Sequence, residues 1–235
     1  MRKSIAILAA CGPFLLAPLR GEAQAIPDWP GRPGQYVFEV TRDGKPIGTQ
    51  TVTLKQDGQA LTVTTESTIA VKILGVVVYR MHQVLTETFQ GRKLVAIAAE
   101  TKDPQGLRAG EIKRDGDHWS GKIGKQIRDF DCDCLASTMW QMAGLSGPRM
   151  IEASEGRPRT VTVEDKGTDM LDLPEGKVET RHFAVKGELA REVWYDPAGN
   201  LVSAQQIGSD GSLIRQILLR DPLARRETGA EASQP

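Results

Sequence analysis

The feature that most constrains this chain is a stretch from Leu61 to Ile73 in which apolar and polar side chains alternate. The odd-numbered positions are Leu61, Val63, Thr65, Ser67, Ile69, Val71 and Ile73, and the even-numbered ones include Thr62, Thr64, Glu66, Thr68 and Lys72. A period of two predicts a long β-strand with one drier face. At about 3.3 Å per residue this strand would reach roughly 40 Å, and a sheet of such strands has to twist and curl.

Turn residues divide the rest of the chain at regular intervals. Asp-Gly pairs begin at Asp43, Asp57, Asp115 and Asp210, and both residue types tolerate the positive φ of tight hairpin turns. The runs between turns predict further strands at residues 36–40, 49–54, 76–89, 94–101, 118–123, 160–164, 178–185, 190–195, 201–207 and 213–219. Because no strand–helix–strand alternation is present, we expect an all-β fold, either a curled antiparallel sheet or a partial β-barrel.

One segment departs from this pattern. Between Leu135 and Leu145 apolar side chains recur at helical spacing, Asp133 precedes them as a candidate N-cap, and Gly144 and Gly147 are candidate terminators. This arrangement predicts one short helix inserted near residues 135–145.

The first residues have the order of a secretory signal peptide. Arg2 and Lys3 precede an apolar stretch from Ile5 to Leu19, and small residues occupy Ala23 and Ala25. We expect cleavage after Ala25, which makes residues 1–25 a signal peptide and the mature protein periplasmic or secreted. In the alternative, Leu8-Ala9-Ala10-Cys11 acts as a lipobox and Cys11 carries a lipid anchor.

The remaining chain predicts one structural unit. We expect residues 26–220 to form a single β-rich domain, with two lobes over 26–130 and 149–220 as the alternative. Residues 221–235 are small and polar and predict a disordered tail.

Charge and hydropathy exclude two classes of protein. The chain has 30 basic and 30 acidic side chains, whereas a protein that binds nucleic acid through phosphate contacts normally has a basic surplus. After the N-terminal stretch no apolar run approaches the ~20 residues of a membrane span. We therefore expect no nucleic-acid partner and no integral membrane span after signal cleavage.

Several short motifs resemble an uncharacterised family of exported bacterial β-sheet proteins, a domain of unknown function. The motifs are Phe38-Glu39-Val40, Asp43-Gly44, Ile47-Gly48, Ile73-Leu74-Gly75 with Tyr79, Val193-Trp194-Tyr195-Asp196, Leu201-Val202 and Asp210-Gly211. The resemblance covers roughly residues 35–219. It implies an exported, curled antiparallel fold, and it supplies no catalytic residue.

The most unusual element is Asp131-Cys132-Asp133-Cys134, which holds the last two cysteines of the chain. In an oxidising compartment Cys132 and Cys134 can form a local disulfide, bind a soft metal, act in redox chemistry or pair with another chain. A metal would need further ligands, for which His82, His118, His182, Met139 and Met142 are the candidates.

No motif in the chain dictates a reaction. It has no nucleophile elbow, phosphate loop or dinucleotide fingerprint, and its three histidines are far apart in sequence. The carboxylates on expected strands are Glu87, Glu100, Glu179 and Glu192, and we expect them to face solvent. We therefore assign no catalytic residue, no cofactor and no metal ligand, and an enzyme is the less favoured class.

The function that these patterns favour is a non-enzymatic binding module. We expect the concave face of the curled sheet to bind an apolar or amphipathic ligand, or another protein of the bacterial envelope. The candidate groove-lining residues are Leu61, Val63, Ile69, Val71, Ile73, Tyr79 and Trp194. The alternatives are a thiol redox or metal-binding factor that uses Cys132 and Cys134, and a purely structural envelope protein.

Overall fold

A computed structural model describes residues 33–220, and its regular structure is β-strand apart from one 3-10 turn. The expected signal peptide (1–25) and tail (221–235) lie outside these residues. The first half of the chain forms β1 (Gly34–Arg42), β2 (Lys45–Asp57), β3 (Ala60–Ile73), β4 (Val76–Gln90), β5 (Lys93–Asp103), β6 (Gly106–Asp115), β7 (His118–Ile123) and β8 (Gln126–Asp131). No helix within residues 33–220 is long and apolar enough to cross a bilayer.

The second half begins with short elements and continues with a meander of longer strands. These elements are β9 (Leu135–Ala136), a 3-10 turn (Met142–Leu145), β10 (Arg149–Glu152), β11 (Arg157–Leu173), β12 (Gly176–Gly187), β13 (Arg191–Tyr195), β14 (Leu201–Ile207) and β15 (Leu213–Arg220).

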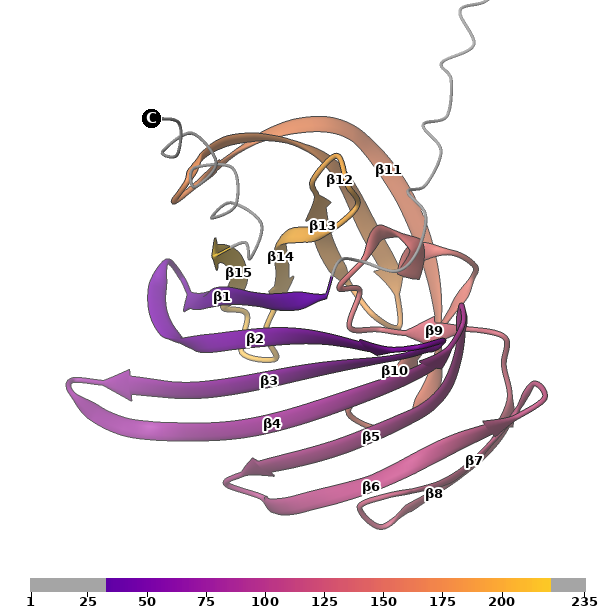
Figure 1. Cartoon of the computed structure of the whole chain (residues 1–235). Helices are drawn as coiled ribbons and strands as arrows, with labels where there is room; N and C mark the ends of the chain where they lie inside the picture. The colour runs from indigo at the N-terminus through magenta and orange to yellow at the C-terminus, as the bar shows by residue number, and fades with distance from the viewer. Residues whose placement is uncertain (1–32, 221–235) are drawn as a thin grey trace, which may run out of the picture.

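All strands belong to one 15-stranded sheet in the order β8-β7-β6-β5-β4-β3-β2-β1-β15-β14-β13-β12-β11-β10-β9. Neighbours are antiparallel except β9 and β10, which are parallel. The first and last strands, β1 and β15, pair at the centre of the sheet, and the two halves curl away from them (Figure 1). The expected all-β class and curled antiparallel sheet are therefore confirmed.

The alternation that predicted the long strand is visible in the burial of β3. Leu61, Val63, Thr65 and Ser67 are buried on its inner face, whereas Glu66 is exposed on the other. The strand pairs with β2 on one side and β4 on the other, which fixes this face toward the interior. A slip of one residue would reverse every side chain, so the pattern also fixes the register.

The helix expected near 135–145 is not an α-helix. The segment consists of β9, an irregular stretch and the 3-10 turn. Met139 has a φ of 51°, a left-handed value that interrupts a right-handed helix. Its neighbours Trp140, Met142 and Leu145 are all buried, because the segment is enclosed between the two halves of the sheet. The apolar residues of this segment are therefore buried because the segment is enclosed on all sides. Their spacing does not mark one face of a helix.

Strands β6 and β8 were not predicted, because their sequences lack a continuous apolar face. Ile112 is the one fully buried residue of β6, and β8 keeps Phe130 partly buried against the core. Both lie near an edge of the sheet, where less of each strand is covered.

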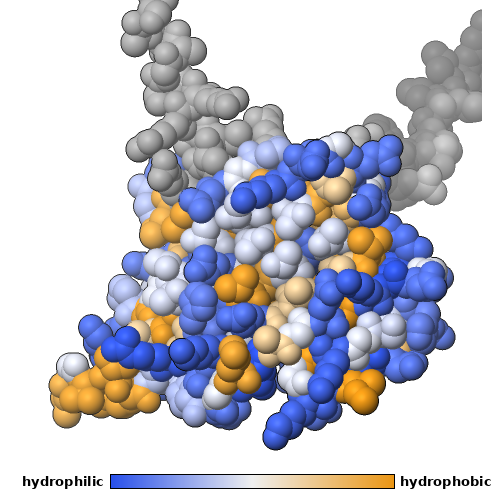
Figure 2. Space-filling model, turned by 60° about the horizontal axis from the view of Figure 1, so that its bottom comes forward, coloured by the Kyte–Doolittle hydropathy of each residue, from blue (hydrophilic) through white to orange (hydrophobic). Residues whose placement is uncertain are grey.

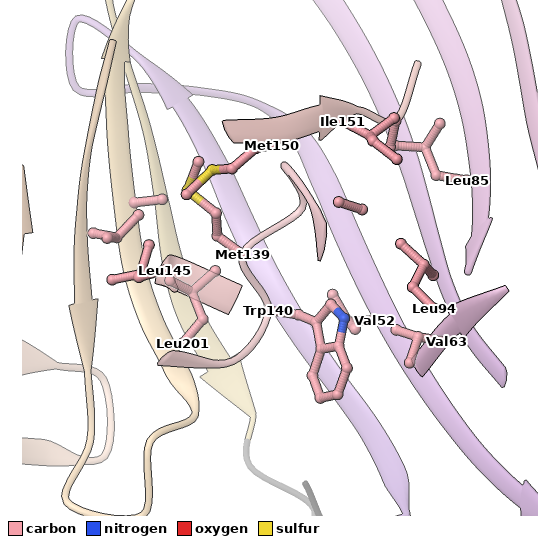
Figure 3. Close-up of a cluster of buried hydrophobic side chains, with 14 of the residues drawn as sticks. Val52, Val63, Leu85, Leu94, Met139, Trp140, Leu145, Met150, Ile151 and Leu201 are labelled. Atoms are coloured by element: carbon pink, nitrogen blue, oxygen red, sulfur yellow. The ribbon is translucent and has the colours of Figure 1, made fainter. Parts of the chain in front are cut away.

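Residues 132–156, which we call the plug, lie between β8 and β11 in sequence, include β9 and β10, and fill the space between the two halves of the sheet. In Figure 3 the plug side chains lie between strands β2–β5 on one side and β14 on the other. The labelled plug residues are Met139, Trp140, Leu145, Met150 and Ile151, and the labelled sheet residues are Val52, Val63, Leu85, Leu94 and Leu201. Part of the concave face is therefore covered by a segment of the same chain.

Buried hydrogen bonds attach the plug to both halves of the sheet. The Trp119 indole on β7 donates to the carbonyl of Cys132 at 3.0 Å, and the Tyr195 hydroxyl on β13 donates to the carbonyl of Met139 at 2.9 Å. Both donors belong to fully buried side chains. Losing either bond would leave a buried carbonyl unpaired, at a cost of about 1–3 kcal/mol.

A buried carboxyl forms the third attachment. The Thr138 hydroxyl donates to one oxygen of Glu87, and the Trp140 indole donates to the other at 3.4 Å. Burial raises the pKa of Glu87 from 4.5 to about 7, although both hydrogen bonds favour the carboxylate. The expectation that Glu87 faces solvent is therefore wrong, since β4 places it between Leu85 and Phe89 on the inner face.

We expect Glu87→Gln to stabilise the protein at pH 8 and to change little at pH 5. The pKa of Glu87 is higher in the folded than in the unfolded state, so its contribution to the free energy of unfolding falls as the pH rises from about 4.5 to about 7. Glutamine does not titrate, and the variant should exceed the wild type at pH 8 by up to about 3 kcal/mol. Denaturant titrations at both pH values measure this difference, and equal destabilisation at both would contradict the assignment.

Candidate functional site

An open groove lies where β3 and β5 end and β4 begins. Its volume is about 560 Å³, within the usual range for small-molecule sites. Its apolar lining consists of Ile69, Ala70, Val77, Val78, Tyr79, Met81 and Pro104, and Arg80, Lys102 and Asp103 supply charged side chains. Burial, and then the nearby Asp103 carboxylate, raise the pKa of Tyr79, so its phenol remains protonated.

A second cavity of about 220 Å³ lies between the sheet and the plug. Its lining is largely polar: Gln50, Thr65, Ser67 and Gln83 on β2–β4, Ser137, Thr138, Glu152 and Ser154 on the plug, and Arg191, Gln206 and Gln216 on β13–β15. Ile69 and Met81 line both spaces. The apolar groove and the polar cavity therefore meet along these two side chains.

Most polar groups in the cavity bind one another. The amide oxygen of Gln50 accepts hydrogen bonds from Ser67 and Gln216, each at 3.1 Å, and Gln83 donates to Thr101 at 3.0 Å. Thr65 differs, because it is 5% exposed and its hydroxyl has no hydrogen-bond partner within residues 33–220. A buried hydroxyl of this kind is available to a polar group of a bound molecule.

Arg191 brings a positive charge to the cavity. Its guanidinium donates to the side-chain oxygen of Gln206 at 3.0 Å and to the carbonyl of Ser137 at 3.3 Å, and both acceptors are neutral. Burial lowers the pKa of Arg191 while electrostatic interactions with Tyr195 and Glu152 oppose this shift, and a guanidinium keeps its proton in proteins. Glu152 forms its ion pair with Arg159. Arg191 therefore lacks an ion-pair partner within residues 33–220 and favours a bound anion.

The seven predicted groove-lining residues lie in several environments. Ile69 and Tyr79 line the groove, and Val71 pairs with Tyr79 across β3 and β4. Leu61 and Val63 belong to the packed core, and Ile73 is 56% exposed at the end of β3. Trp194 lies on β13, in the other half of the sheet, where its ring stacks on His182 at 4.2 Å between centroids.

Cys132 and Cys134 form a disulfide in the short connection between the edge strands β8 and β9. Each is 5% exposed, so another thiolate has little access to it. The flanking carboxylates bind other side chains: Asp131 lies 2.9 Å from His118, and Asp133 accepts a hydrogen bond from Arg114 at 2.7 Å. This placement favours a structural role for the pair.

The histidines lie apart from one another. His82 contacts Glu66 at 2.9 Å, His118 contacts Asp131, and His182 stacks on Trp194. The hydrogen bond to Asp131 raises the pKa of His118. Within the part of the chain that the structure describes, no three His, Cys, Asp or Glu side chains gather as metal ligands would.

Sequence reasoning did not find Arg191, Thr65 or the glutamines of the cavity. Arg191 comes from a strand whose neighbours gave no hint that β13 faces β3 across the plug. The sequence of β3 could have indicated the cavity, because Thr65 and Ser67 occupy odd-numbered positions that are otherwise apolar. Polar residues at those positions indicate that the inner face changes from core to cavity.

These features define a class: a barrel-like protein whose open antiparallel sheet encloses its own plug and keeps a groove at one end. The chain belongs to the family described as a domain of unknown function, DUF6134, whose sequence profile matches residues 38–219. The resemblance seen in the sequence motifs is thereby confirmed.

One solved structure shares the fold. The crystal structure of a beta-barrel-like protein of domain of unknown function DUF1849 from Brucella abortus matches with a TM-score of 0.59 and 12% sequence identity. The match covers 80% of this chain and 96% of that one. At this identity the similarity concerns the fold alone. A search of curated protein sequences gives no match.

We expect loss of the Cys132–Cys134 disulfide to cost little stability. The bond closes a loop of three residues, so the entropy that it removes from the unfolded chain corresponds to about 1–2 kcal/mol. Denaturant titration of the double variant Cys132→Ala/Cys134→Ala measures this cost. A loss of more than about 4 kcal/mol, or loss of the folded state, would show that the bond holds the edge strands together.

Proposed function

We propose that this protein is an exported, non-enzymatic binding module for an amphipathic molecule with one apolar chain and an anionic head. The observation that carries the proposal is the junction of the apolar groove with the polar cavity at Ile69 and Met81. A molecule with both characters satisfies both spaces, whereas a purely apolar or purely polar ligand satisfies one.

Each of the two spaces suits one end of the proposed ligand. The apolar chain lies in the groove along β3 and β4, where each buried CH₂ group contributes about 0.8 kcal/mol. The head lies near Arg191, whose guanidinium can bind a carboxylate or phosphate, and Thr65 supplies a further hydroxyl. The anionic head also compensates the charge of Arg191, a partly buried side chain that has no ion pair within residues 33–220.

Export rests on the N-terminal sequence and on the disulfide. The order of charge, apolar stretch and small residues up to Ala25 is that of a signal peptide. A disulfide between Cys132 and Cys134 is stable in an oxidising compartment such as the periplasm. Protein recovered from the periplasm should have the denatured mass of residues 26–235 less two hydrogens.

Displacement of a fluorescent fatty-acid probe by palmitate, with 1-hexadecanol as the uncharged competitor, tests the site. We expect palmitate to displace the probe at micromolar concentration. Met81→Glu places a charge in the groove and should weaken palmitate binding at least tenfold. The matched control is Met170→Glu, at a methionine of β11 that is 55% exposed and outside both spaces.

The head is tested separately with Arg191→Gln. This variant should weaken palmitate binding roughly tenfold, as expected for loss of a charged hydrogen bond, and leave 1-hexadecanol binding unchanged. Thermal unfolding of each variant shows whether the fold is intact. Failure of both competitors to bind the wild type, or equal losses in the Met81 and Met170 variants, would contradict the proposal and favour a purely structural role.

A further inference from the structure

The hairpin of β3 and β4 extends beyond both of its neighbours. The pairing of β2 with β3 ends at Ile69, and the pairing of β4 with β5 ends at His82. Residues 70–81, which we call the hairpin tip, therefore continue as a two-stranded ribbon of four residue pairs. At about 3.3 Å per residue the ribbon projects roughly 13 Å, and Figure 1 shows it reaching past the adjacent turns.

The end of the hairpin tip is apolar and exposed. The exposed fractions are 56% for Ile73, 98% for Leu74, 65% for Val76 and 53% for Val78. Figure 2 shows an apolar patch on the protruding corner at the lower left of that view. Single exposed apolar residues are ordinary, but four on one projecting turn form a contiguous surface of the kind that binds partners.

The turn at Leu74 and Gly75 has a backbone conformation that leucine disfavours. Leu74 has a φ of 49° and Gly75 a φ of 81°, so both central residues of the two-residue turn are left-handed. Asparagine, aspartate or glycine normally occupies the first of these positions, because a leucine there is strained. Leu74 is thus unfavourable in the folded monomer because of its backbone conformation and because of its exposure to water. Contact with an apolar environment outside the protein would remove the cost of exposure.

Positive charge flanks this apolar end. Lys72 and Arg80 lie on the two strands of the hairpin tip, and neither side chain has an ion pair or hydrogen bond within residues 33–220. From Ser67 to Thr86 the sequence contains no aspartate or glutamate. The carboxylates at the base of the ribbon, Glu66 and Asp103, are paired with His82 and Arg108.

We propose that the hairpin tip docks on a membrane surface with anionic lipid headgroups. Ile73, Leu74, Val76 and Val78 enter the boundary between headgroups and acyl chains, while Lys72 and Arg80 bind lipid phosphates. The ribbon is too short to cross, and its unpaired edges keep it at the interface, since exposed backbone is not tolerated in the hydrocarbon core. A membrane fits this surface better than a protein groove, because the apolar end is a projecting turn and both of its strands carry a cation.

This docking goes beyond ligand binding and does not depend on it. Leu74, the centre of the docking surface, lines neither the groove nor the polar cavity. A variant at Leu74 therefore tests the docking surface while leaving the proposed ligand site intact.

Flotation with vesicles of phosphatidylethanolamine and phosphatidylglycerol at a 3:1 molar ratio tests the proposal. We expect the mature protein to float with these vesicles, and Leu74→Asn to lower the partition coefficient roughly tenfold or more. Asparagine suits the left-handed turn, so this variant should unfold at the same temperature as the wild type or a higher one. Lys72→Gln/Arg80→Gln should abolish the preference for these vesicles over phosphatidylcholine vesicles.

The matched control is Ile127→Asn, at an isoleucine of β8 that is 78% exposed and lies outside the hairpin tip. It should leave flotation unchanged. Absence of flotation in the wild type, or equal losses for Leu74→Asn and Ile127→Asn, would overturn the proposal. A dimer in solution that Leu74→Asn converts to a monomer, without vesicle binding, would also overturn it and assign the surface to a second copy of the chain.

Discussion

The enclosure of the plug between the two halves of one curled sheet determines the rest of the structure. A sheet of this length cannot leave its whole concave face in water, and the chain covers part of it with residues 132–156, which lie between β8 and β11 in sequence. Hydrogen bonds from Trp119 and Tyr195, together with the buried Glu87, fix the plug to both halves. Because these groups are buried, a plug in another position would leave them without hydrogen-bond partners, at a high cost in free energy. Each bond therefore helps to specify the position of the plug.

The plug also decides where the protein remains open. It packs against β2–β5 and β14 at one end of the concave face, and the space that it does not fill is the polar cavity and the adjoining groove. Apolar side chains therefore give way to polar ones along the same strand, from Leu61 and Val63 to Thr65 and Ser67. One strand thus serves the core, the cavity, the groove and, at its end, the exposed hairpin tip.

The sequence predicted the features that depend on local alternation and turn chemistry. The period of two placed β3, and Asp43-Gly44 placed the first hairpin, because both signals act within a few residues. The predictions from sequence were wrong where burial depends on tertiary contacts. The apolar residues around Trp140 have the spacing of a helix face. Glu87 resembles a surface carboxylate unless its alternation with Leu85 and Phe89 on the inner face is recognised. Arg191 could not be placed in a cavity, since that depends on β13 facing β3 across the plug. Of the predicted groove, the part near Ile69 and Tyr79 lies at the site, and Trp194 does not.

The central claim, that the open end of the concave face is a ligand site, is tested most directly by NMR of methionine methyl groups during titration with palmitate. Met81 lines the groove and the cavity, Met139, Met142 and Met150 are buried in the plug, and Met170 lies exposed on β11. We predict that the Met81 methyl signal shifts with saturable dependence on palmitate while the Met170 signal stays in place. A shift at Met170 with no change at Met81 would contradict the account.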